Sequence, residues 1–544
     1  MVWPTDYDVK LDEYDAMDLP GQQLAASQAS STLDHILHLD VTAPAPCQRL
    51  TAIVASIGKS SRDIESIEKM LAAGMNIALI NFVFGKLDEH IETIKNIREA
   101  NKNYSRSVGR TCPLAIAGML YGKKIRTGTI LPTFGEKVEL KAGENLRLTT
   151  DETYRERCSE NIVYVDYMNL SEQVTKGTKV YLDNEKIMLL VDVVSKTTVT
   201  CKIVVGGHLG SNKDVFVSNT VLDMPNYSER DKELIEIAIR NQLDILIAPF
   251  VNSTDAITEL RHLMGERGRR IAIVANIQTI EGFHNFDDIL AKTNGVMITR
   301  QELGSDISPN KLVIAQKNMI IRANKANIPV LVNAHILKSM RKKRAPLRSE
   351  LCDVANCVLD GADGLVLSAE TAIGQSPVDT IRVITEVCKE AESCVWSERM
   401  FLEMMNKTPM PCDQTTGTAL SAVLAAQRLL AAAIIVMTTS GKTAQIISRY
   451  KPRCPIVAVT RYAAIARQLH LWRAIMPLVY EETPKSDWEQ DMKERIKFCT
   501  SWAMERGFMR VGDPYVLVSG FVGAGASNTA RIEYATDDII TVNI

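Results

Sequence analysis

A run of small hydroxyl residues with one glycine, Thr438-Thr-Ser-Gly-Lys-Thr, follows an apolar stretch that ends at Met437. When such a run follows a strand and opens a helix, its backbone amides and hydroxyls can donate hydrogen bonds to a phosphate. The sequence therefore predicts a phosphate-binding loop made of Thr438, Thr439, Ser440, Gly441, Lys442 and Thr443. The alternative is that these residues only begin a helix.

Apolar runs that alternate with amphipathic segments must position this loop and any other site. From Leu50 onward, eight short apolar runs resemble buried parallel strands. They lie at 52–55, 77–80, 114–117, 245–248, 271–274, 296–298, 330–332 and 364–367. Helical patterns separate many of them, at 63–73, 228–241 and 254–265. Eight strands that alternate with helices predict an α/β fold, the (β/α)8 TIM barrel.

The alternation stops between about residues 123 and 224, where the chain is rich in Thr, Val and Lys. Short β-prone runs at 179–182, 188–194 and 200–205 predict an antiparallel β domain inserted after the third barrel strand. A second series of apolar strands, at 433–437, 455–459, 475–479 and 514–518, predicts a separate doubly wound α/β domain. The expected domains are a tail and helix at 1–49, the barrel at 50–122 and 225–395, the insert at 123–224, and the last domain at 396–544.

The bulk composition narrows the class of protein. The chain has 544 residues, 46% apolar and 24% charged, as in a folded globular protein. Its 63 basic and 65 acidic side chains leave a formal charge of −2, so no nucleic acid or acidic membrane is expected as a partner. Eleven cysteines without CxxC pairs favour a reducing compartment over a disulfide framework.

Neither a secretory signal nor a membrane span is expected. Acidic side chains such as Asp6 and Asp8 stand where a signal peptide would be basic, and residues 1–30 show no sustained apolar period, as in a mobile tail. The most apolar segment, 419–437, contains Gln427 and Arg428 and is interpreted as a buried helix followed by a buried strand. We therefore expect a cytoplasmic protein.

A barrel interrupted after its third strand by a β domain and followed by an α/β domain is the arrangement of the pyruvate kinases. Gly74-Met-Asn-Ile-Ala with Asn81-Phe resembles that family's GMNVARLNFSHG segment, and Asp353-Val-Ala-Asn-Cys-Val-Leu-Asp-Gly-Ala-Asp resembles DVANAVLDGAD. Lys124-Ile-Arg-Thr-Gly resembles its EIRTG turn, and Gly207-His-Leu-Gly-Ser its phosphate-side hairpin. The resemblance runs from about residue 31 to the C-terminus. It implies a TIM barrel, an inserted β-barrel domain and a C-terminal doubly wound domain.

The resemblance also implies a reaction, the transfer of the phosphoryl group of phosphoenolpyruvate to ADP to give pyruvate and ATP. That reaction gathers negative charge in a small volume. It therefore needs Mg²⁺ held by carboxylates, a lysine at the moving phosphoryl group and arginines on the substrate.

Two of the family's charged positions are neutral in this chain. Asn276, in Ile273-Val-Ala-Asn-Ile-Gln, occupies the position of the catalytic lysine, and Gln278 that of a Mg²⁺-binding glutamate. Loss of one charge-stabilising cation in phosphoryl transfer costs about 10³-fold or more. We interpret Asn276 and Gln278 as polar barrel residues at the mouth of a strand.

The segment Thr299-Arg-Gln-Glu-Leu-Gly resembles the family's ARGDLG, and Arg300 keeps its arginine. Glu302 takes the place of the second Mg²⁺ carboxylate with an extra methylene, and because Mg²⁺ tolerates poor geometry badly, weak magnesium binding is expected. Gln301 replaces a glycine whose amide approaches the substrate phosphate, and its side chain can fill the pocket.

Three further substitutions remove side chains that the family uses. Leu79 stands at the position of a substrate-binding arginine, Phe84 at that of a histidine, and Ala334 at that of a threonine near the site of proton transfer.

The monovalent-cation site of the family is also altered. Of its ligands only Asn81 remains, since the other positions are Val83, Met119 and Leu120, and Tyr121 replaces a nearby lysine. Lys124 stands where potassium-dependent members have glutamate, and its ammonium can replace K⁺. Potassium is therefore not expected to be required.

Several retained residues match ligand contacts of the family. Arg126 matches a phosphate-contacting arginine, but it can equally be a salt-bridged barrel residue. Lys213 matches a nucleotide-side lysine, although on a polar hairpin a solvated role is favoured. The loop at 438–443 resembles the family's effector-phosphate loop TxSGRS, and Trp488 and Arg495 match two more effector contacts. A second loop, at 519–527, lacks the family's Trp-Arg pair, which predicts weaker binding of a sugar phosphate.

Two hypotheses follow. The first is an impaired or noncatalytic relative of the pyruvate kinases with a structural or regulatory role in homo- or hetero-tetramers. The second is an active pyruvate kinase whose rearranged site uses Glu302, Lys124 and Arg126. The first is favoured, because uncompensated loss of charge inside a phosphate site is hard to repair.

Overall fold

The structure, a computed structural model, describes residues 23–183, 186–218, 220, 223–520 and 527–536. Eight parallel strands close into a barrel in the order β1-β17-β16-β15-β14-β13-β3-β2. Their bounds are β1 Ala52–Ser56, β2 Ile77–Asn81, β3 Ala115–Met119, β13 Ile245–Ala248, β14 Ala272–Ile277, β15 Gly295–Thr299, β16 Val330–Asn333 and β17 Gly364–Leu367. The predicted TIM barrel is confirmed.

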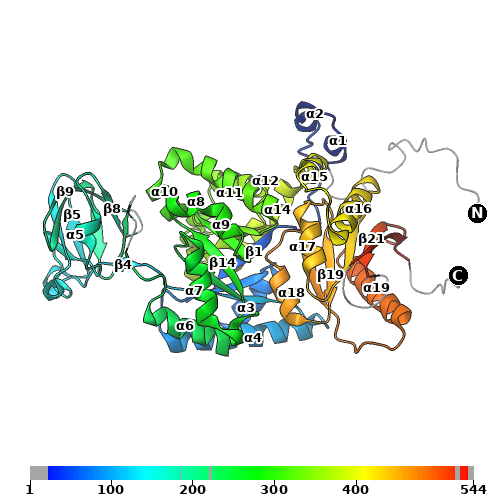
Figure 1. Cartoon of the computed structure of the whole chain (residues 1–544), viewed down its shortest axis with the longest axis horizontal. Helices are drawn as coiled ribbons and strands as arrows, with labels where there is room; N and C mark the ends of the chain where they lie inside the picture. The colour runs from blue at the N-terminus through cyan, green and yellow to red at the C-terminus, as the bar shows by residue number, and fades with distance from the viewer. Residues whose placement is uncertain (1–22, 184–185, 219, 221–222, 521–526, 537–544) are drawn as a thin grey trace, which may run out of the picture.

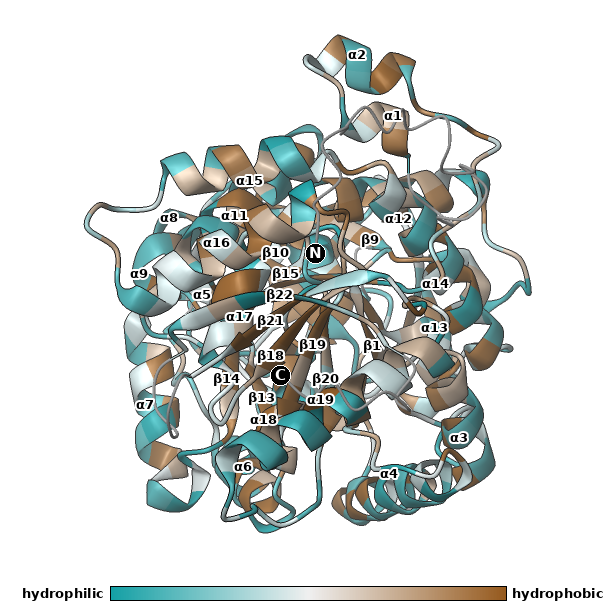
Figure 2. Ribbon diagram, turned by 90° about the vertical axis from the view of Figure 1, so that its right-hand side faces the viewer, coloured by the Kyte–Doolittle hydropathy of each residue, from teal (hydrophilic) through white to brown (hydrophobic). Residues whose placement is uncertain are grey.

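Helices surround this barrel and cover the outer faces of its strands (Figure 1). The longer ones are α3 Ile64–Ala72, α4 Leu87–Ser107, α6 Glu229–Arg240, α7 Thr254–Met264, α11 Leu312–Ala326, α12 Arg348–Leu359 and α14 Pro377–Ser393. Shorter ones follow the later strands, namely α8 Ile280–His284, α9 Phe286–Leu290, α10 Arg300–Asp306 and α13 Ala369–Ala372. The strands are mostly apolar, apart from polar residues near their carboxyl ends, because the helices bury one face and the barrel interior the other (Figure 2).

The inserted domain stands at one end of the molecule, away from the C-terminal domain (Figure 1). Its strands are β4 Ile125–Arg126, β5 Lys137–Leu140, β6 Asn145–Thr149, β7 Ile162–Tyr164, β8 Lys179–Leu182, β9 Ile187–Val194, β10 Thr198–Val205, β11 Gly207–Gly210 and β12 Asp214–Val217, with helix α5 Leu170–Gln173. They form a seven-stranded sheet, β4-β12-β8-β9-β10-β6-β7, and a two-stranded sheet of β11 and β5. The insert was expected to be a β-barrel, whereas among the described residues its strands form two separate sheets that share one core.

One pairing in the insert differs from the expected antiparallel arrangement. Strands β6 and β7 pair in parallel, with Arg147 opposite Ile162. A short hairpin turn would force antiparallel pairing, whereas the twelve-residue connection at 150–161 lets the chain return to the same end before β7 begins.

The C-terminal domain contains a five-stranded sheet in the order β20-β19-β18-β21-β22. Its elements are α15 Ser397–Asn406, α16 Gln414–Arg428, β18 Ala433–Met437, α17 Lys442–Arg449, β19 Ile456–Thr460, α18 Ala463–Leu469, β20 Ile475–Val479, α19 Trp488–Glu505, β21 Pro514–Ser519 and β22 Thr529–Tyr534. Apolar clusters lie on both faces of the sheet, as in a doubly wound domain. The segment at 419–437 is a helix followed by a buried strand, as expected, and within the described ranges no helix is long and apolar enough to cross a membrane.

Strand β22 and a short helix near the N-terminus are among the elements that were not anticipated from the sequence. Strand β22, antiparallel to β21, forms one edge of the C-terminal sheet. Near the N-terminus, α1 Leu24–Ser27 lies within the segment expected to be a mobile tail and packs against α2 Thr32–Leu37. The ring of His35 in α2 hydrogen-bonds the carbonyl of Ala26 over 2.7 Å, so this pair of helices is held by tertiary contacts that a four-residue helix cannot reveal in its own sequence.

The C-terminal domain is docked on the amino ends of the barrel strands. Lys451 lies 2.8 Å from Asp363, the residue before β17, and both side chains are buried. Arg467 lies 2.7 Å from Asp244, the residue before β13. Since the site residues that the resemblance implies lie at the opposite, carboxyl ends of the strands, this polar interface leaves that end open.

Candidate functional site

Asn276 is the first residue in a chain of hydrogen bonds between uncharged side chains at the carboxyl ends of four barrel strands. Its amide oxygen accepts a hydrogen bond of 2.6 Å from the hydroxyl of Thr299, whose oxygen in turn accepts one of 3.2 Å from the Asn333 amide. The side-chain amide oxygen of Asn333 accepts a hydrogen bond of 2.9 Å from the hydroxyl of Ser368. Asn276 is only 2% exposed. Neutral donors and acceptors therefore satisfy one another at the position where the resemblance places the catalytic lysine.

Gln278 follows β14 and is similarly enclosed. Its side-chain oxygen accepts a hydrogen bond of 2.8 Å from the backbone amide of Phe250, and the residue is 3% exposed. Phe250 has φ +50°, in the left-handed region that side chains rarely adopt. We infer that the Gln278 amide holds the turn after β13 in this conformation.

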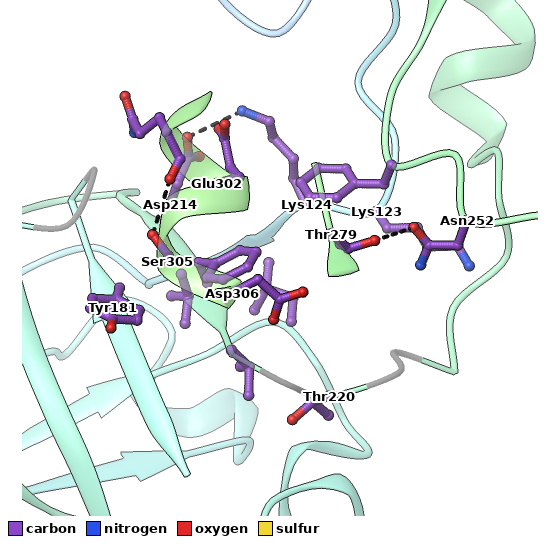
Figure 3. Close-up of a pocket in the computed structure, with 16 residues that line it drawn as sticks. Lys123, Lys124, Tyr181, Asp214, Thr220, Asn252, Thr279, Glu302, Ser305 and Asp306 are labelled. Carbon is purple, nitrogen blue, oxygen red and sulfur yellow. Dashed lines mark hydrogen bonds and ion pairs between the residues drawn. The ribbon is translucent and has the colours of Figure 1, made fainter. Parts of the chain in front are cut away.

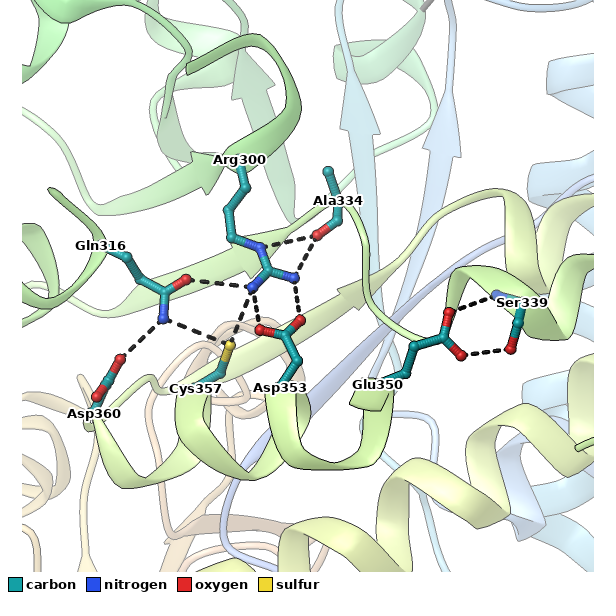
Figure 4. A network of polar contacts seen from close by, with 8 residues as sticks. All are labelled: Arg300, Gln316, Ala334, Ser339, Glu350, Asp353, Cys357 and Asp360. Carbon is teal, nitrogen blue, oxygen red and sulfur yellow. Dashed lines mark hydrogen bonds and ion pairs between the residues drawn. The ribbon is translucent and has the colours of Figure 1, made fainter. Parts of the chain in front are cut away.

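Arg300, at the start of α10, makes its contacts inside the protein (Figure 4). Its guanidinium forms a two-pronged pair with Asp353 at 2.7 and 2.8 Å, and two of its N–H groups donate to the carbonyl of Ala334 at 2.8 and 3.1 Å. Ala334 has φ +69° and its neighbour His335 φ +60°. Arg300 thus holds the turn after β16, whose residues adopt left-handed backbone angles.

A cavity of about 70 Å³ lies between the inserted domain and the mouth of the barrel (Figure 3). The insert contributes Lys124, Asp214 and Phe216 to its lining, and α10 of the barrel contributes Gln301 and Glu302. Gln301 and Glu302 therefore line a cavity that meets both domains.

Asp214 connects the two cations on the insert side of this cavity. Its carboxylate lies 3.2 Å from the Lys124 ammonium and 3.3 Å from the Arg126 guanidinium, with which it shares a register position in the β4–β12 pair. Arg126 was expected either to contact a phosphate or to form a salt bridge in the barrel. The structure shows a salt bridge, but it lies in the sheet of the insert.

Tyr121 lies at the hinge, the short segment where the chain passes from the barrel into the insert, and two arginines stack on its ring. Arg126 and Arg230 lie over its ring at 5.0 and 5.2 Å from the centroid. Burial raises the pKa of the Tyr121 phenol, although both arginines oppose the shift, so the ring remains neutral at physiological pH. The backbone amide of Tyr121 donates to buried Asp231, which also caps α6 and so fixes the hinge to the barrel.

The other expected positions lie apart from this cavity. Leu79 is buried in the apolar interior of the barrel, and Phe84 is 62% exposed. Lys213 lies 3.6 Å from Asp183 with 38% of its side chain exposed, which fits the solvated role favoured for it.

The loop at 438–443 lies at the carboxyl edge of the C-terminal sheet. The chain runs outward from β18 to β19 and β20 on one side and to β21 on the other, so the loop after β18 stands at the point where the strand order reverses. Open α/β sheets bind their ligands at such points. Gly441, the N-cap of α17, has φ +81°, and a Cβ there would meet Leu469 at 2.8 Å, so glycine is required.

The polar groups of this loop divide into inward and outward sets. The Thr438 hydroxyl accepts from the Gly441 amide at 2.9 Å, and the Thr443 hydroxyl shares a 2.7 Å hydrogen bond with Ser527. Thr439, Ser440 and Lys442 are exposed. In the second loop, residues 521–526 lie outside the described part of the chain.

Trp488 and Arg495, expected as further effector contacts, contact each other. The Arg495 guanidinium lies 5.4 Å from the Trp488 ring centroid and 2.6 Å from the Asp491 carboxylate. Arg461, after β19, also pairs with Asp491 at 2.6 Å. Asp491 thus holds two arginines beside α19.

Comparison with known proteins shows the family to which the chain belongs. Residues 48–381 match the family model described as pyruvate kinase, barrel domain, and residues 417–533 match pyruvate kinase, alpha/beta domain. The human protein named pyruvate kinase PKLR is 39% identical over 94% of this chain and 89% of its own length. Pyruvate kinase 1 of Saccharomyces cerevisiae is 36% identical over 92% of this chain and 99% of its own length. The chain belongs to the pyruvate kinase family.

The residues present do not fit the family's magnesium site. Of the two carboxylate positions, only Glu302 carries a carboxylate, and the Gln278 oxygen is engaged by the Phe250 amide. Among the described residues, no group of three or more His, Cys, Asp or Glu side chains is arranged to hold a metal ion. Mg²⁺ prefers an octahedron of oxygen ligands, which this set does not supply.

The pyruvate kinase potassium site is not reproduced either. The Asn81 side-chain oxygen accepts a hydrogen bond of 3.0 Å from the Val83 amide, and Val83 and Leu120 present buried apolar side chains. Met119 is packed against the apolar interior of the barrel. Lys124 is the residue whose charge was expected to replace K⁺, and the Asp214 carboxylate neutralises that charge.

Sequence reasoning missed the residues that complete these sites. Thr299, Asn333 and Ser368 belong to three different strand ends, and parallel pairing of the neighbouring strands β14 to β17 brings them into one chain of hydrogen bonds with Asn276. Asp214 directly follows Lys213, so its charge was visible, but its partners lie about ninety residues earlier in the chain.

Proposed function

We propose that this member of the pyruvate kinase family turns over phosphoenolpyruvate and ADP at least about 10³-fold more slowly than an active pyruvate kinase, or not at all. The chain of neutral hydrogen bonds from Ser368 through Asn333 and Thr299 to Asn276 carries the proposal. Phosphoryl transfer requires fixed positive charge beside the moving group. In this chain, Asn276 contributes only an amide there, and its oxygen is already used.

The remaining charged groups support the same proposal. Lys124 and Arg126 share the carboxylate of Asp214, and Arg300 is paired with Asp353. A cation that has a carboxylate partner stabilises a developing negative charge less well than an unpaired one. A structural or regulatory role within an assembly is the function that this arrangement favours.

An assay of pyruvate formation by homogeneous recombinant protein, with and without Mg²⁺, tests the proposal. Pyruvate kinase 1 of Saccharomyces cerevisiae, assayed in parallel, is the positive control. We expect no pyruvate above the background of a mock purification. A kcat on the order of 10² s⁻¹ would overturn the proposal.

A second candidate function is an active pyruvate kinase with a rearranged site. One observation favours it, since Lys124 and Glu302 line the same cavity. If this function holds, Glu302→Gln and Lys124→Gln will each abolish the activity found in the assay. If the first proposal holds, the unmodified protein will already be inactive.

We further propose that the protein assembles in the cytoplasm as a homo- or hetero-tetramer and binds a sugar phosphate at the loop of the C-terminal domain. Strand β22 supports the assembly, because Ile532 and Tyr534 on this edge strand are 52% and 60% exposed. An exposed apolar edge strand tends to pair with another chain. Light scattering after size exclusion measures the mass, and co-purification with an active pyruvate kinase distinguishes hetero-assembly from self-assembly.

A further inference from the structure

Asp214 takes the position that an anionic ligand would need at the insert side of the cavity. Its two carboxylate oxygens each contact one cation, Lys124 at 3.2 Å and Arg126 at 3.3 Å. These three side chains are between 17% and 28% exposed, so solvent screens them only in part. A phosphate that reached Lys124 and Arg126 would have to compete with a carboxylate already attached to the protein.

The charges that line the cavity strengthen this effect. Two lysines, Lys123 and Lys124, and three carboxylates, Asp214, Glu302 and Asp306, line the cavity. Figure 3 shows the Lys124 ammonium directed toward Asp214, with Glu302 beside it. The carboxylates of Glu302 and Asp306 bring further negative charge toward a phosphate-bearing ligand, and each like charge close to it costs binding free energy.

The geometry points to Asp214 as an internal counter-ion that excludes phosphate-bearing ligands from the cleft between the insert and the barrel. Asp214 is the first residue of β12 and lies opposite Arg126 of β4, so its carboxylate is held in place by sheet pairing. Arg126 is further fixed by stacking on Tyr121 at 5.0 Å from the ring centroid. The two cations are therefore preorganised, and removal of one negative charge converts them into an anion site.

The proposal is tested by calorimetric titration of inorganic pyrophosphate and of phosphoenolpyruvate into the full-length protein. Asp214→Asn keeps the shape of the side chain and removes its charge, and we expect its Kd for pyrophosphate to be at least about tenfold lower than that of the unmodified protein. The gain should disappear in the double variants Asp214→Asn/Arg126→Gln and Asp214→Asn/Lys124→Gln. Asp192→Asn, which removes an exposed carboxylate from β9 of the same domain, is the matched control and should change nothing.

Two results would overturn the inference. One is a Kd for Asp214→Asn within twofold of that of the unmodified protein, in a variant whose thermal unfolding is unchanged. The other is a gain that survives the loss of Arg126 and Lys124. Should Asp214→Asn fail to fold, titration of the unmodified protein decides the question. Micromolar binding of pyrophosphate that Lys124→Gln abolishes would show that Asp214 does not exclude anions. Weak binding that Lys124→Gln leaves unchanged would support the inference. The readout is binding alone, so a failure here is distinguishable from a failure of the proposed lack of turnover.

Discussion

The ammonium group of Lys451, in the C-terminal domain, lies 2.8 Å from the carboxylate of Asp363, in the barrel, and neither side chain is more than 5% exposed. Lys451 also donates to the Gly361 carbonyl at 3.2 Å, and Asp363 accepts from the backbone amides of Val330 and Arg473. Burial lowers the pKa of Lys451, and Asp363 opposes that shift. The pair is therefore an enclosed ionic contact that joins two domains.

Lys451→Met should lower the free energy of unfolding by about 3–5 kcal/mol, because it leaves the Asp363 carboxylate buried without its counter-ion. Urea denaturation followed by tryptophan fluorescence measures the change. Lys176→Met, which breaks an exposed pair with Asp192, is the control and should cost less than about 1 kcal/mol. A loss as small for Lys451→Met as for the control would mean that the domain contact does not depend on this pair.

His470, at the same interface, should make the protein less stable in acid. Burial lowers the pKa of His470 to about 4, and its ring donates from Nε2 to the Pro113 carbonyl at 2.6 Å. The unfolded chain, with a pKa of about 6.5, binds a proton as the pH falls while the folded chain does not. The contribution of His470 to the free energy of unfolding is therefore complete above about pH 6.5 and is lost on acidification. The loss between pH 7.5 and pH 5 is about 2 kcal/mol.

Urea denaturation at the two pH values checks this prediction. His470→Gln should flatten the pH dependence, whereas His284→Gln, at an exposed position in α8, should leave it unchanged. An equal pH dependence in the unmodified protein and in His470→Gln would assign the acid sensitivity to other groups.

Any residual turnover should not require potassium. The side chains of Val83, Met119 and Leu120 offer no oxygen ligands for a cation, and the Asn81 side-chain oxygen is engaged by the Val83 amide. The measurement compares the rate in KCl with that in tetramethylammonium chloride at equal ionic strength. Marked activation by K⁺ would show that a cation site exists elsewhere in the protein.

The loop after β18 should bind a sugar bisphosphate whether or not the barrel binds substrate. Ser440 and Lys442 are exposed there, and the Ser440 hydroxyl accepts only a long hydrogen bond of 3.4 Å from the Lys442 amide, while the hydroxyls of Thr438 and Thr443 are engaged within the protein. Calorimetry with fructose 1,6-bisphosphate should therefore show binding that Lys442→Ala and Ser440→Ala each weaken by about tenfold. Lys493→Ala, at an exposed pair in α19, is the matched control. Absence of heat at millimolar ligand would mean that the loop only begins a helix.

The sequence by itself determined the order of the elements and the neutral character of the barrel site. Uninterrupted apolar runs such as Ile245–Ala248 indicate strands buried on both faces, and Ser228 with Asp231 marks the start of α6, because both signals are local. The loss of charge at Asn276 and Gln278 is likewise a property of the residues themselves.

Only the tertiary structure decided which groups satisfy one another. Asn276 accepts from Thr299, which is linked in turn to Asn333 and Ser368 at the next strand ends, and the partner shared by Lys124 and Arg126 lies about ninety residues further along the chain. Strand β22 could not be recognised because it lies at a sheet edge, where its pattern of Arg, Ile, Glu and Tyr has no apolar run. Pairing across such separations is set by barrel closure and sheet register, which no local pattern of residues encodes.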